Sequence, residues 1–246
     1  MAFSSWRGIV GIIKPTMRPG GLEDMIRLLP EGIGVIPLFN DIQRGDRSEF
    51  KEVMKDYDAK VAILAEQGCD VIHPEGAPPF MVMGLDGEAK KIKSWERKHK
   101  IPVFTSGTNH IAALKALKVK RIVGASYFRG EINQTFAAYF KAAGFDVLAF
   151  EGMDVDFNQA QNLSSHQVYA FIKKLVLKNP KADGIYMLGT GWKVLDIIPL
   201  LEGDLGIPVV HPVPSRVWEF QKRLSIHEPR EGYGRLLAEM PKMVKL

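Results

Sequence analysis

Short apolar runs rich in valine and isoleucine recur along this chain. They alternate with longer stretches in which apolar residues fall on one helical face. Most of the short runs are continuously apolar, which is typical of parallel strands covered on both faces. Strands are predicted at 8–13, 33–39, 70–74, 102–105, 121–125, 146–150, 184–188 and 208–211. The alternation favours the α/β class with parallel sheets.

Two of the intervening segments have clear helix boundaries. Ser48 can cap a helix whose apolar stripe continues until Gly68 ends it. Ser164 or Ser165 can cap another helix, which Pro180 stops just before the strand at 184–188. Each helix therefore leads the chain into the next strand, as β–α–β units require.

One pattern occurs twice in the sequence. The interval from Gly11 to Gly124 equals the interval from Gly76 to Gly189, so the two glycines of each copy are equally spaced. The matching segments are Gly8-Ile9-Val10-Gly11 with Arg121-Ile122-Val123-Gly124, Asp70-Val71-Ile72 with Asp183-Gly184-Ile185, and Ile101-Pro102-Val103 with Ile207-Pro208-Val209. The two members of the third pair are separated by a shorter interval along the chain than the members of the first two pairs, so one loop differs in length between the copies. Ligands of such chains usually bind between the copies, where strand ends converge.

The repeat predicts two pseudo-symmetric α/β lobes, each a four-stranded, mainly parallel sheet flanked by helices. The first lobe is expected to span 1–116 and the second 117–214. The final segment, 215–246, is expected to pack back on the first lobe. Its apolar residues on one helical face are Val217, Trp218, Phe220 and Leu224.

Composition is that of an ordinary globular protein. The 246 residues are 46% hydrophobic and 25% charged, and no apolar run approaches the ~20 residues needed to span a bilayer. The segment from Met1 to Arg7 lacks the pattern of a signal peptide, so a cytoplasmic protein with no membrane partner is expected. The sequence leaves open whether the chain forms a homo-oligomer.

The net charge of +5 (33 − 28) comes largely from two basic stretches, 90–100 and 115–121. Neither has interleaved aromatic residues or a nucleic-acid motif, so they are interpreted as solvated helix faces, and no nucleic-acid partner is expected. A mildly positive field does suit an anionic substrate. The single cysteine, Cys69, excludes an intrachain disulfide and is expected to be buried and inert.

The loops after the predicted strands are rich in glycine, serine and threonine. Such loops expose backbone N–H groups that bind carboxylate or phosphate oxygens, although any one of them is equally typical of ordinary turns. They are Lys14-Pro15-Thr16, His73 to Pro79, Thr105 to Thr108, Ser126-Tyr127, Leu188 to Trp192 and His211-Pro212. None has the spacing of a P-loop or a complete dinucleotide fingerprint, so no nucleotide cofactor is expected.

Few titratable residues follow the strands. Glu75 is a candidate acid or base, or else a carboxylate that is solvated or caps a helix. His73 and His211 occupy only roughly equivalent positions in the two copies, so no shared metal site is expected. The residues do not form a recognisable Ser/His/Asp arrangement.

Several segments give the chain a resemblance to the Asp/Glu racemase superfamily, on the branch of arylmalonate decarboxylases and maleate isomerases. The resemblance covers nearly the whole chain. It rests on Gly8–Pro15, Gly68–Pro79, Tyr127 with Asn133, Asp183–Pro199, Leu205–Val209 and Gly232–Leu236. It implies two pseudo-symmetric lobes with the site between them, and chemistry without a metal or organic cofactor.

The resemblance also implies one or two catalytic cysteines, and this chain departs from it there. The first thiol position matches Gly76 and the second matches Gly189, or Thr190 if the register shifts by one residue. Cys69 lies at the wrong end of its strand to substitute for either. The family mechanism therefore cannot be carried over intact.

The features that bind the substrate are better retained. Tyr127 matches the family tyrosine that donates a hydrogen bond to a substrate carboxylate, and we expect it to face the 189–191 turn across one cleft. The resemblance assigns carboxylate-binding N–H groups to Ala77 in the first loop and to Thr190 and Gly191 in the second, and Gly76 and Gly189 are also expected to line the substrate site. Pro78 and Pro79 remove two donors from the first loop. Pro15, with Thr16 beside it, matches the loop that covers the pocket.

These observations favour a cofactor-independent lyase, most simply a decarboxylase acting on a small carboxylate. Oxyanion donors would stabilise the enolate that is left, and Tyr127, Glu75, His211 or water would return the proton. One alternative is an isomerase, racemase or hydrolase that uses Glu75 or a histidine as base. Another is a carboxylate-binding relative without activity.

Overall fold

Two parallel β-sheets form the framework of the protein. The computed structural model describes residues 4–153 and 155–244, so the parts of the predicted units at 1–3, 154 and 245–246 lie outside the described residues. The first sheet has the order β2-β1-β3, and the second has the order β5-β4-β6-β7. The strands are β1 (Gly8–Lys14), β2 (Ile33–Phe39), β3 (Val71–Pro74), β4 (Arg121–Ser126), β5 (Asp146–Gly152), β6 (Gly184–Met187) and β7 (Val209–Val210).

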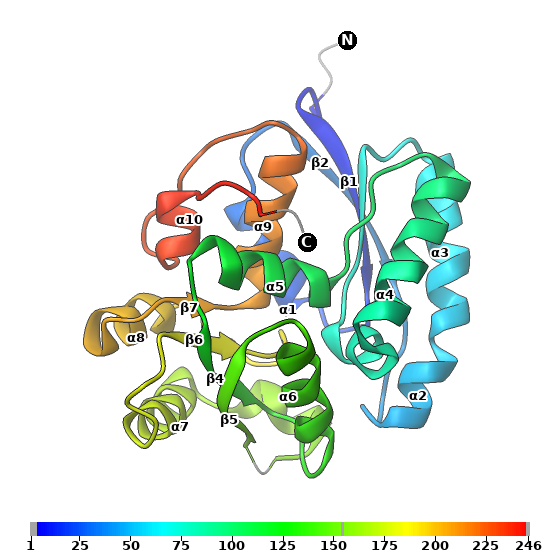
Figure 1. The fold of residues 1–246 in the computed structure, drawn as a ribbon. Helices are drawn as coiled ribbons and strands as arrows, with labels where there is room; N and C mark the ends of the chain where they lie inside the picture. The colour runs from blue at the N-terminus through cyan, green and yellow to red at the C-terminus, as the bar shows by residue number, and fades with distance from the viewer. Residues whose placement is uncertain (1–3, 154, 245–246) are drawn as a thin grey trace.

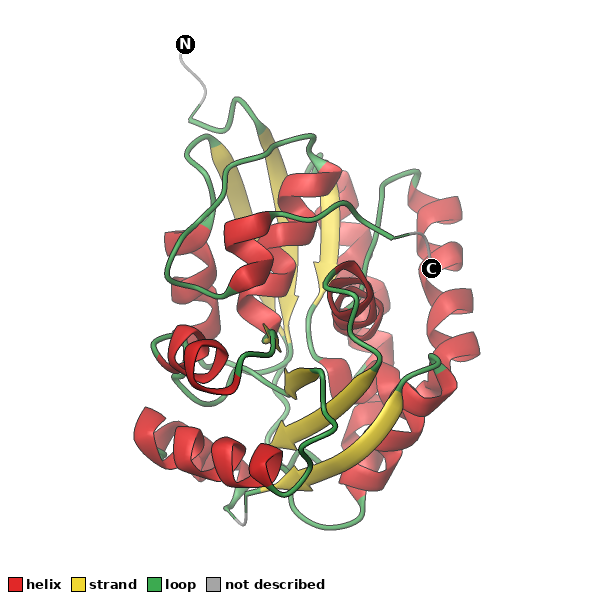
Figure 2. Ribbon diagram, turned by 60° about the vertical axis from the view of Figure 1, so that its left-hand side comes forward, coloured by secondary structure: helices red, strands yellow, loops and turns green. Residues whose placement is uncertain are grey.

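Helices flank both sheets, which lie in opposite halves of the molecule (Figures 1 and 2). They are α1 (Gly20–Leu28), α2 (Arg47–Glu52), α3 (Met54–Glu66), α4 (Ala77–His99), α5 (Ser106–Ala116), α6 (Ile132–Ala142), the 3₁₀ helix η1 (Phe157–Asn162), α7 (Ser165–Leu177), α8 (Ile197–Leu205), α9 (Pro212–Arg223) and α10 (Arg235–Glu239). Among the described residues, no helix combines the length and the apolar character needed to cross a bilayer.

Seven of the eight predicted strands are present, and the predicted α/β class is confirmed. The first sheet has three strands rather than four, because the segment 102–105 makes only an isolated parallel bridge between Val103 and Ile72. The Ile72 N–H donates to the Pro102 carbonyl at 3.0 Å, and the Phe104 N–H donates to the Ile72 carbonyl at 3.2 Å. Helix α5 begins two residues after Phe104, which leaves no chain to extend the ladder.

The repeat in the sequence corresponds to a repeat in topology. β1 and β4 are the central strands that carry Gly11 and Gly124, while Gly76 and Gly189 follow the neighbouring strands β3 and β6. The registers differ by one residue: Gly11 pairs with Ile72, four positions before Gly76, whereas Gly124 pairs with Tyr186, three positions before Gly189. Gly76 and Gly189 have φ values of +107° and +98°, so both turns use a conformation that favours glycine.

The helix boundaries follow local capping chemistry. Ser164 caps α7 in a capping box with Gln167, which settles the choice between Ser164 and Ser165. The prediction that Ser48 caps its helix is wrong, because the Asp46 side chain accepts from the Glu49 N–H at 2.9 Å and starts α2. An ionised carboxylate is the stronger acceptor at a helix N-terminus.

Helix α9 runs through the interior. All its residues from Pro212 to Gln221 are buried, and it packs against α1 and α5 on one side and α10 on another (Figure 1). Its buried apolar side chains include Val217, Trp218 and Phe220, and the Trp218 indole N–H donates to the Pro241 carbonyl at 2.9 Å. Because α9 is enclosed, its polar residues also lie inside the protein, Arg216 among them.

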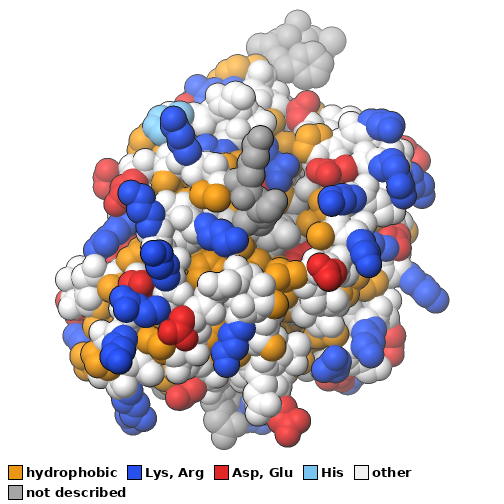
Figure 3. Space-filling model, viewed as in Figure 1, with side chains coloured by type: hydrophobic (Ala, Val, Ile, Leu, Met, Phe, Trp, Pro, Cys, Tyr) orange, Lys and Arg blue, Asp and Glu red, His pale blue; other side chains and the backbone are white. Residues whose placement is uncertain are grey.

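Charged side chains are mostly at the surface. Figure 3 shows lysines and arginines spread over one face among aspartates and glutamates. Lys14, Glu75 and Arg216 are exceptions, since none is more than 2% exposed. A buried ion is costly unless it is paired, so the positions of these three charges relative to one another matter.

Cys69 is 3% exposed, and burial raises the pKa of its thiol to about 11, with a smaller contribution from Asp70. We expect Cys69→Ser to leave ligand binding unchanged and to cost about 1–2 kcal/mol of stability, because it buries a hydroxyl in place of a thiol. Iodoacetamide should modify the native thiol far more slowly than the denatured one, as measured by mass spectrometry. Rapid alkylation of the native protein would contradict this assignment.

Candidate functional site

A central pocket lies where the ends of the strands from both sheets meet. Its cavity volume is about 50 Å³, enough for a few waters. All the site residues predicted from the sequence line it except His211. They are Pro15, Thr16, Glu75, Gly76, Ala77, Tyr127, Gly189, Thr190 and Gly191.

The lining combines matching positions from the two copies of the repeat. Seven pairs of lining residues are related by the intervals that relate the copies in the sequence. They are Lys14 with Tyr127, Pro15 with Phe128, Gly76 with Gly189, Ala77 with Thr190, Pro78 with Gly191, Ser106 with Pro212, and His110 with Arg216. The pocket is thus built on one pseudo-symmetric plan, but the charges in it are asymmetric.

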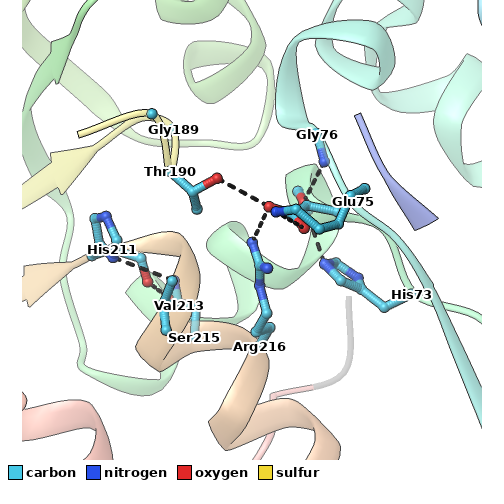
Figure 4. Close-up of polar contacts among 12 residues, drawn as sticks. His73, Glu75, Gly76, Gly189, Thr190, His211, Val213, Ser215 and Arg216 are labelled. Carbon is cyan, nitrogen blue, oxygen red and sulfur yellow. Dashed lines mark hydrogen bonds and ion pairs between the residues drawn. The ribbon is translucent and has the colours of Figure 1, made fainter. Parts of the chain in front are cut away.

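Glu75 is the centre of a buried ionic cluster in this pocket. Its Oε1 lies 2.7 Å from Nη2 of Arg216 and accepts a hydrogen bond from the Thr190 hydroxyl at 3.1 Å. Its Oε2 lies 3.5 Å from Nζ of Lys14. Figure 4 shows Arg216 and Thr190 approaching the carboxylate from different elements. One carboxylate therefore joins β1, the β3–α4 turn, the β6 turn and α9.

The cluster keeps Glu75 ionised. Burial alone would raise the pKa of Glu75, but Arg216 and then Lys14 outweigh burial and hold it well below its usual range. Burial lowers the pKa of Lys14, Glu75 opposes that shift, and Arg216 adds to it. With Lys14 protonated, two positive charges face one negative charge. The pocket therefore attracts an anion.

Arg216 has unused hydrogen-bonding capacity. It is 1% exposed and lines the pocket. Apart from the ion pair of Nη2 with Glu75, none of its three guanidinium nitrogens makes a well-directed hydrogen bond to another described residue. Buried polar groups are almost always satisfied, so such donors point to an acceptor that arrives with a ligand. The planar fork of arginine fits a carboxylate in bidentate fashion.

A second, neutral network supports the first loop. The Nδ1–H of His73 donates to the Phe104 carbonyl at 2.9 Å, which leaves Nε2 to accept from the Ser106 hydroxyl at 3.4 Å. Ser106 Oγ accepts from the Gly76 N–H at 3.1 Å, and the Tyr57 hydroxyl donates to the Glu75 carbonyl. Burial, with a further contribution from Arg216, lowers the pKa of His73 to about 3. His73 is thus neutral and positions Ser106 and Gly76.

Part of the pocket lining is aromatic. Phe50 and Phe157 both line it and pack against Phe128, with ring centroids 6.2 and 5.6 Å from that ring. Tyr127 stacks on Phe128 at 4.9 Å. The Arg18 guanidinium lies 4.7 Å from the Phe157 ring centroid and donates to its carbonyl at 3.2 Å. A ligand in the pocket would thus meet both cations and aromatic rings.

Gly76 and Gly189 occupy the two positions where the resemblance implies a thiol. At both positions an added side chain would be crowded. A Cβ on Gly189 would overlap the Tyr127 hydroxyl and lie 2.5 Å from a ring carbon of the same residue. A Cβ on Gly76 would lie 3.0 Å from the Tyr57 hydroxyl and 3.1 Å from Pro15 Cβ. A tyrosine hydroxyl therefore lies against each position where the resemblance implies a thiol.

The sequence suggested that Tyr127 and the 189–191 turn face each other across the pocket, but the structure shows otherwise. They are in direct contact, because the Gly191 N–H donates to the Tyr127 hydroxyl oxygen at 3.3 Å. That N–H is therefore engaged by Tyr127, and the Thr190 hydroxyl is engaged by Glu75. The hydroxyl proton of Tyr127 is donated to no described residue, and it is available to a ligand.

We expect Tyr127→Phe to weaken binding of a carboxylate by about tenfold, because one hydrogen bond to a charged oxygen is worth roughly 1.5–3 kcal/mol. The free energy of unfolding should fall by about 1 kcal/mol at most, since only the contact with Gly191 is lost. Calorimetry with malonate and urea denaturation measure the two effects. Unchanged malonate affinity with a large loss of stability would assign Tyr127 to the core.

His211 does not line the pocket, which argues against the predicted catalytic role. Its Nδ1 accepts from the Val213 N–H at 3.3 Å and caps α9 (Figure 4). Burial and then Arg216 lower the pKa of His211 to about 3. The ring is neutral, and it helps to fix the start of the helix that carries Arg216.

Sequence reasoning placed Lys14 in a loop after a strand but gave it no role, and it missed Arg216. The signal was present in the repeat, because Lys14 is the counterpart of Tyr127 and Arg216 is the counterpart of His110. For metal binding, the described part of the chain contains no group of three or more histidine, cysteine, aspartate or glutamate side chains placed to hold an ion.

Comparison with known proteins finds relatives over most of the chain. A family model described as arylmalonate decarboxylase matches residues 28–237. The arylmalonate decarboxylase of Bordetella bronchiseptica is 25% identical over 178 residues, which cover 72% of this chain and 74% of that protein.

Solved structures of the same kind share the fold. The maleate isomerase Iso from Pseudomonas putida S16 superposes with a TM-score of 0.88 at 17% identity, covering 95% of this chain and 99% of that one. A crystal structure of arylmalonate decarboxylase superposes with a TM-score of 0.80 at 21% identity, covering 94% of this chain and 99% of that one.

Proposed function

Because the chain belongs to the arylmalonate decarboxylase family, we propose that it is a cofactor-independent lyase that removes carbon dioxide from a small dicarboxylate. The observation that carries this proposal is the buried, unsatisfied guanidinium of Arg216 in the lining of the pocket. Its fork would hold the carboxylate that the substrate retains. Lys14 adds a second positive charge nearby.

The aromatic side of the pocket suits the carboxylate that leaves. The rings of Phe50 and Phe128 offer that group no hydrogen bonds, so loss of its charge as neutral carbon dioxide is favoured beside them. When the bond between Cα and the leaving carboxylate breaks, its electron pair passes into the retained carboxylate and forms an enediolate. If Arg216 and Lys14 hold the retained carboxylate, that extra negative charge develops beside two cations, which is the electrostatic contribution that accelerates such reactions.

Catalysis by Glu75 or a histidine as base is less well supported. Two cations hold the pKa of Glu75 below its usual range, which makes it a weak base. His73 and His211, with pKa values of about 3, are weak bases too. These lowered pKa values argue against an isomerase, racemase or hydrolase mechanism in which Glu75, His73 or His211 is the base.

The test is incubation with malonate, methylmalonate and phenylmalonate while carbon dioxide and the monocarboxylate product are measured. Maleate is included to detect isomerisation, and Cys69→Ser is a control variant remote from the pocket. Release of carbon dioxide from at least one malonate, retained in Cys69→Ser, supports the proposal. Conversion of maleate without decarboxylation would make the chain an isomerase. Tight malonate binding with no turnover would make it a carboxylate-binding protein.

A further inference from the structure

Decarboxylation leaves a carbanion-like carbon that must receive a proton, and neither position that the resemblance assigns to a thiol can supply one here. Both are glycines against which a tyrosine hydroxyl packs. We propose that Lys14, at the end of β1, is the acid that protonates this carbon. This inference rests on the proposed function and assigns a catalytic residue within it.

Lys14 has the position that this role requires. It lines the pocket, is 2% exposed and lies at the end of the central strand of its sheet. It is the counterpart of Tyr127, which directly follows the central strand of the other copy. The two central strands therefore each bring one proton-bearing side chain to the same pocket, an ammonium from the first and a phenol from the second.

The surroundings of Lys14 favour the ammonium as the acid. Glu75 holds it at 3.5 Å, while burial and Arg216 lower its pKa from that of a free lysine. A lowered pKa brings the ammonium closer to the operating pH, where a general acid is most effective. Besides Lys14, Glu75 and Arg216, the ionisable groups that line the pocket are Arg18, His110 and Tyr127.

Those other groups are poorer donors. The Arg18 guanidinium already donates to the Phe157 carbonyl and to the Asn158 side chain. Burial raises the pKa of Tyr127 to about 12. Burial also holds the pKa of His110 well below its usual value, so this ring is neutral, and its Nδ1 lies 2.8 Å from the Tyr186 hydroxyl. Lys14 is thus the strongest acid in the lining that still holds a proton.

The electron pair of the enediolate double bond forms a new C–H bond at Cα with a proton from the Lys14 ammonium, and the retained carboxylate is restored. Lys14 becomes a neutral amine and regains a proton from water. In total, the malonate dianion and one proton give carbon dioxide and a monocarboxylate anion.

The test uses a malonate with two different α-substituents, such as methyl(phenyl)malonate, so that protonation creates a stereocentre. The variants are Lys14→Arg, which keeps the positive charge without a readily lost proton, and Lys14→Gln, which removes both. We expect wild type to give one enantiomer in excess. Lys14→Arg should lower kcat by about 10²–10⁴-fold and give a racemic product, because water then delivers the proton.

The pH profile provides an independent measurement. The acid form of Lys14 is required, so kcat should be full below the pKa of Lys14 and fall as the pH rises through it. Glu75→Gln removes the charge that raises this pKa, so the basic limb should move to lower pH, while Lys14→Arg should abolish the limb. Thermal denaturation checks that each variant is folded.

The outcomes separate this inference from the proposed function. If Lys14→Arg matches wild type in rate, enantiomeric excess and pH profile, Lys14 is only a counter-ion for Glu75 and the inference fails while the lyase stands. If wild type exchanges the α-proton of phenylacetate in D₂O in a Lys14-dependent way but releases no carbon dioxide, Lys14 transfers a proton and the decarboxylase proposal fails. If wild type does neither, both fail.

Discussion

Replacing Arg216 with leucine should abolish carboxylate binding and lower the free energy of unfolding by about 3–5 kcal/mol. The stability loss arises because Glu75, which is 2% exposed, loses the cation 2.7 Å from its Oε1. The binding loss arises because Arg216 is the buried cation in the pocket with unused donors. Urea denaturation and calorimetry with malonate measure the two effects separately.

Two further variants keep this prediction testable if Arg216→Leu does not fold. Arg216→Lys retains the charge but not the bidentate fork, so it should fold and bind malonate about tenfold or more weakly. The double variant Arg216→Leu with Glu75→Leu removes both members of the pair, so it should recover much of the lost stability without recovering binding. Wild-type affinity in either variant would show that Arg216 is only a structural partner of Glu75.

Restoring a cysteine at the second thiol position, by Gly189→Cys, should damage the protein instead of improving it. The backbone there has a φ of +98°, and the new Cβ would overlap the Tyr127 hydroxyl. Left-handed strain and overpacking each cost about 1–3 kcal/mol, so we expect a loss of about 3 kcal/mol or more. The midpoint of urea denaturation measures it.

Gly144→Ala is the matched control, because Gly144 has a φ of +90° and an added Cβ would meet nothing within 4 Å. It should show the cost of the backbone conformation alone, about 1–2 kcal/mol. Adding Tyr127→Ala to Gly189→Cys should relieve the overpacking and return part of the stability. If Gly189→Cys alone is as stable as wild type and gains activity, the thiol site is still open in this fold.

Much of the fold is written locally in the sequence. Seven of the eight strands predicted from the apolar runs are present in the structure. Ser164 and Gln167 start α7 through contacts within one turn. The positive φ values of Gly76 and Gly189 suit the one residue type that adopts them at low cost. The strand at 102–105 fails as a prediction because its pairing depends on how soon α5 begins, not on its own apolar pattern.

The chemistry of the pocket was decided only by tertiary structure. The sequence placed Glu75 at a strand end but could not show whether it was a base. Its pKa depends on Lys14 and Arg216. Lys14 precedes Glu75 and Arg216 follows it, each far away along the chain. The sequence likewise placed His211 and Tyr127 at strand ends, where folding turned one into a helix cap and set the other against Gly189. Apolar periodicity is a property of neighbours along the chain, whereas charge pairing and free space depend on distances that exist only once the two copies have packed together.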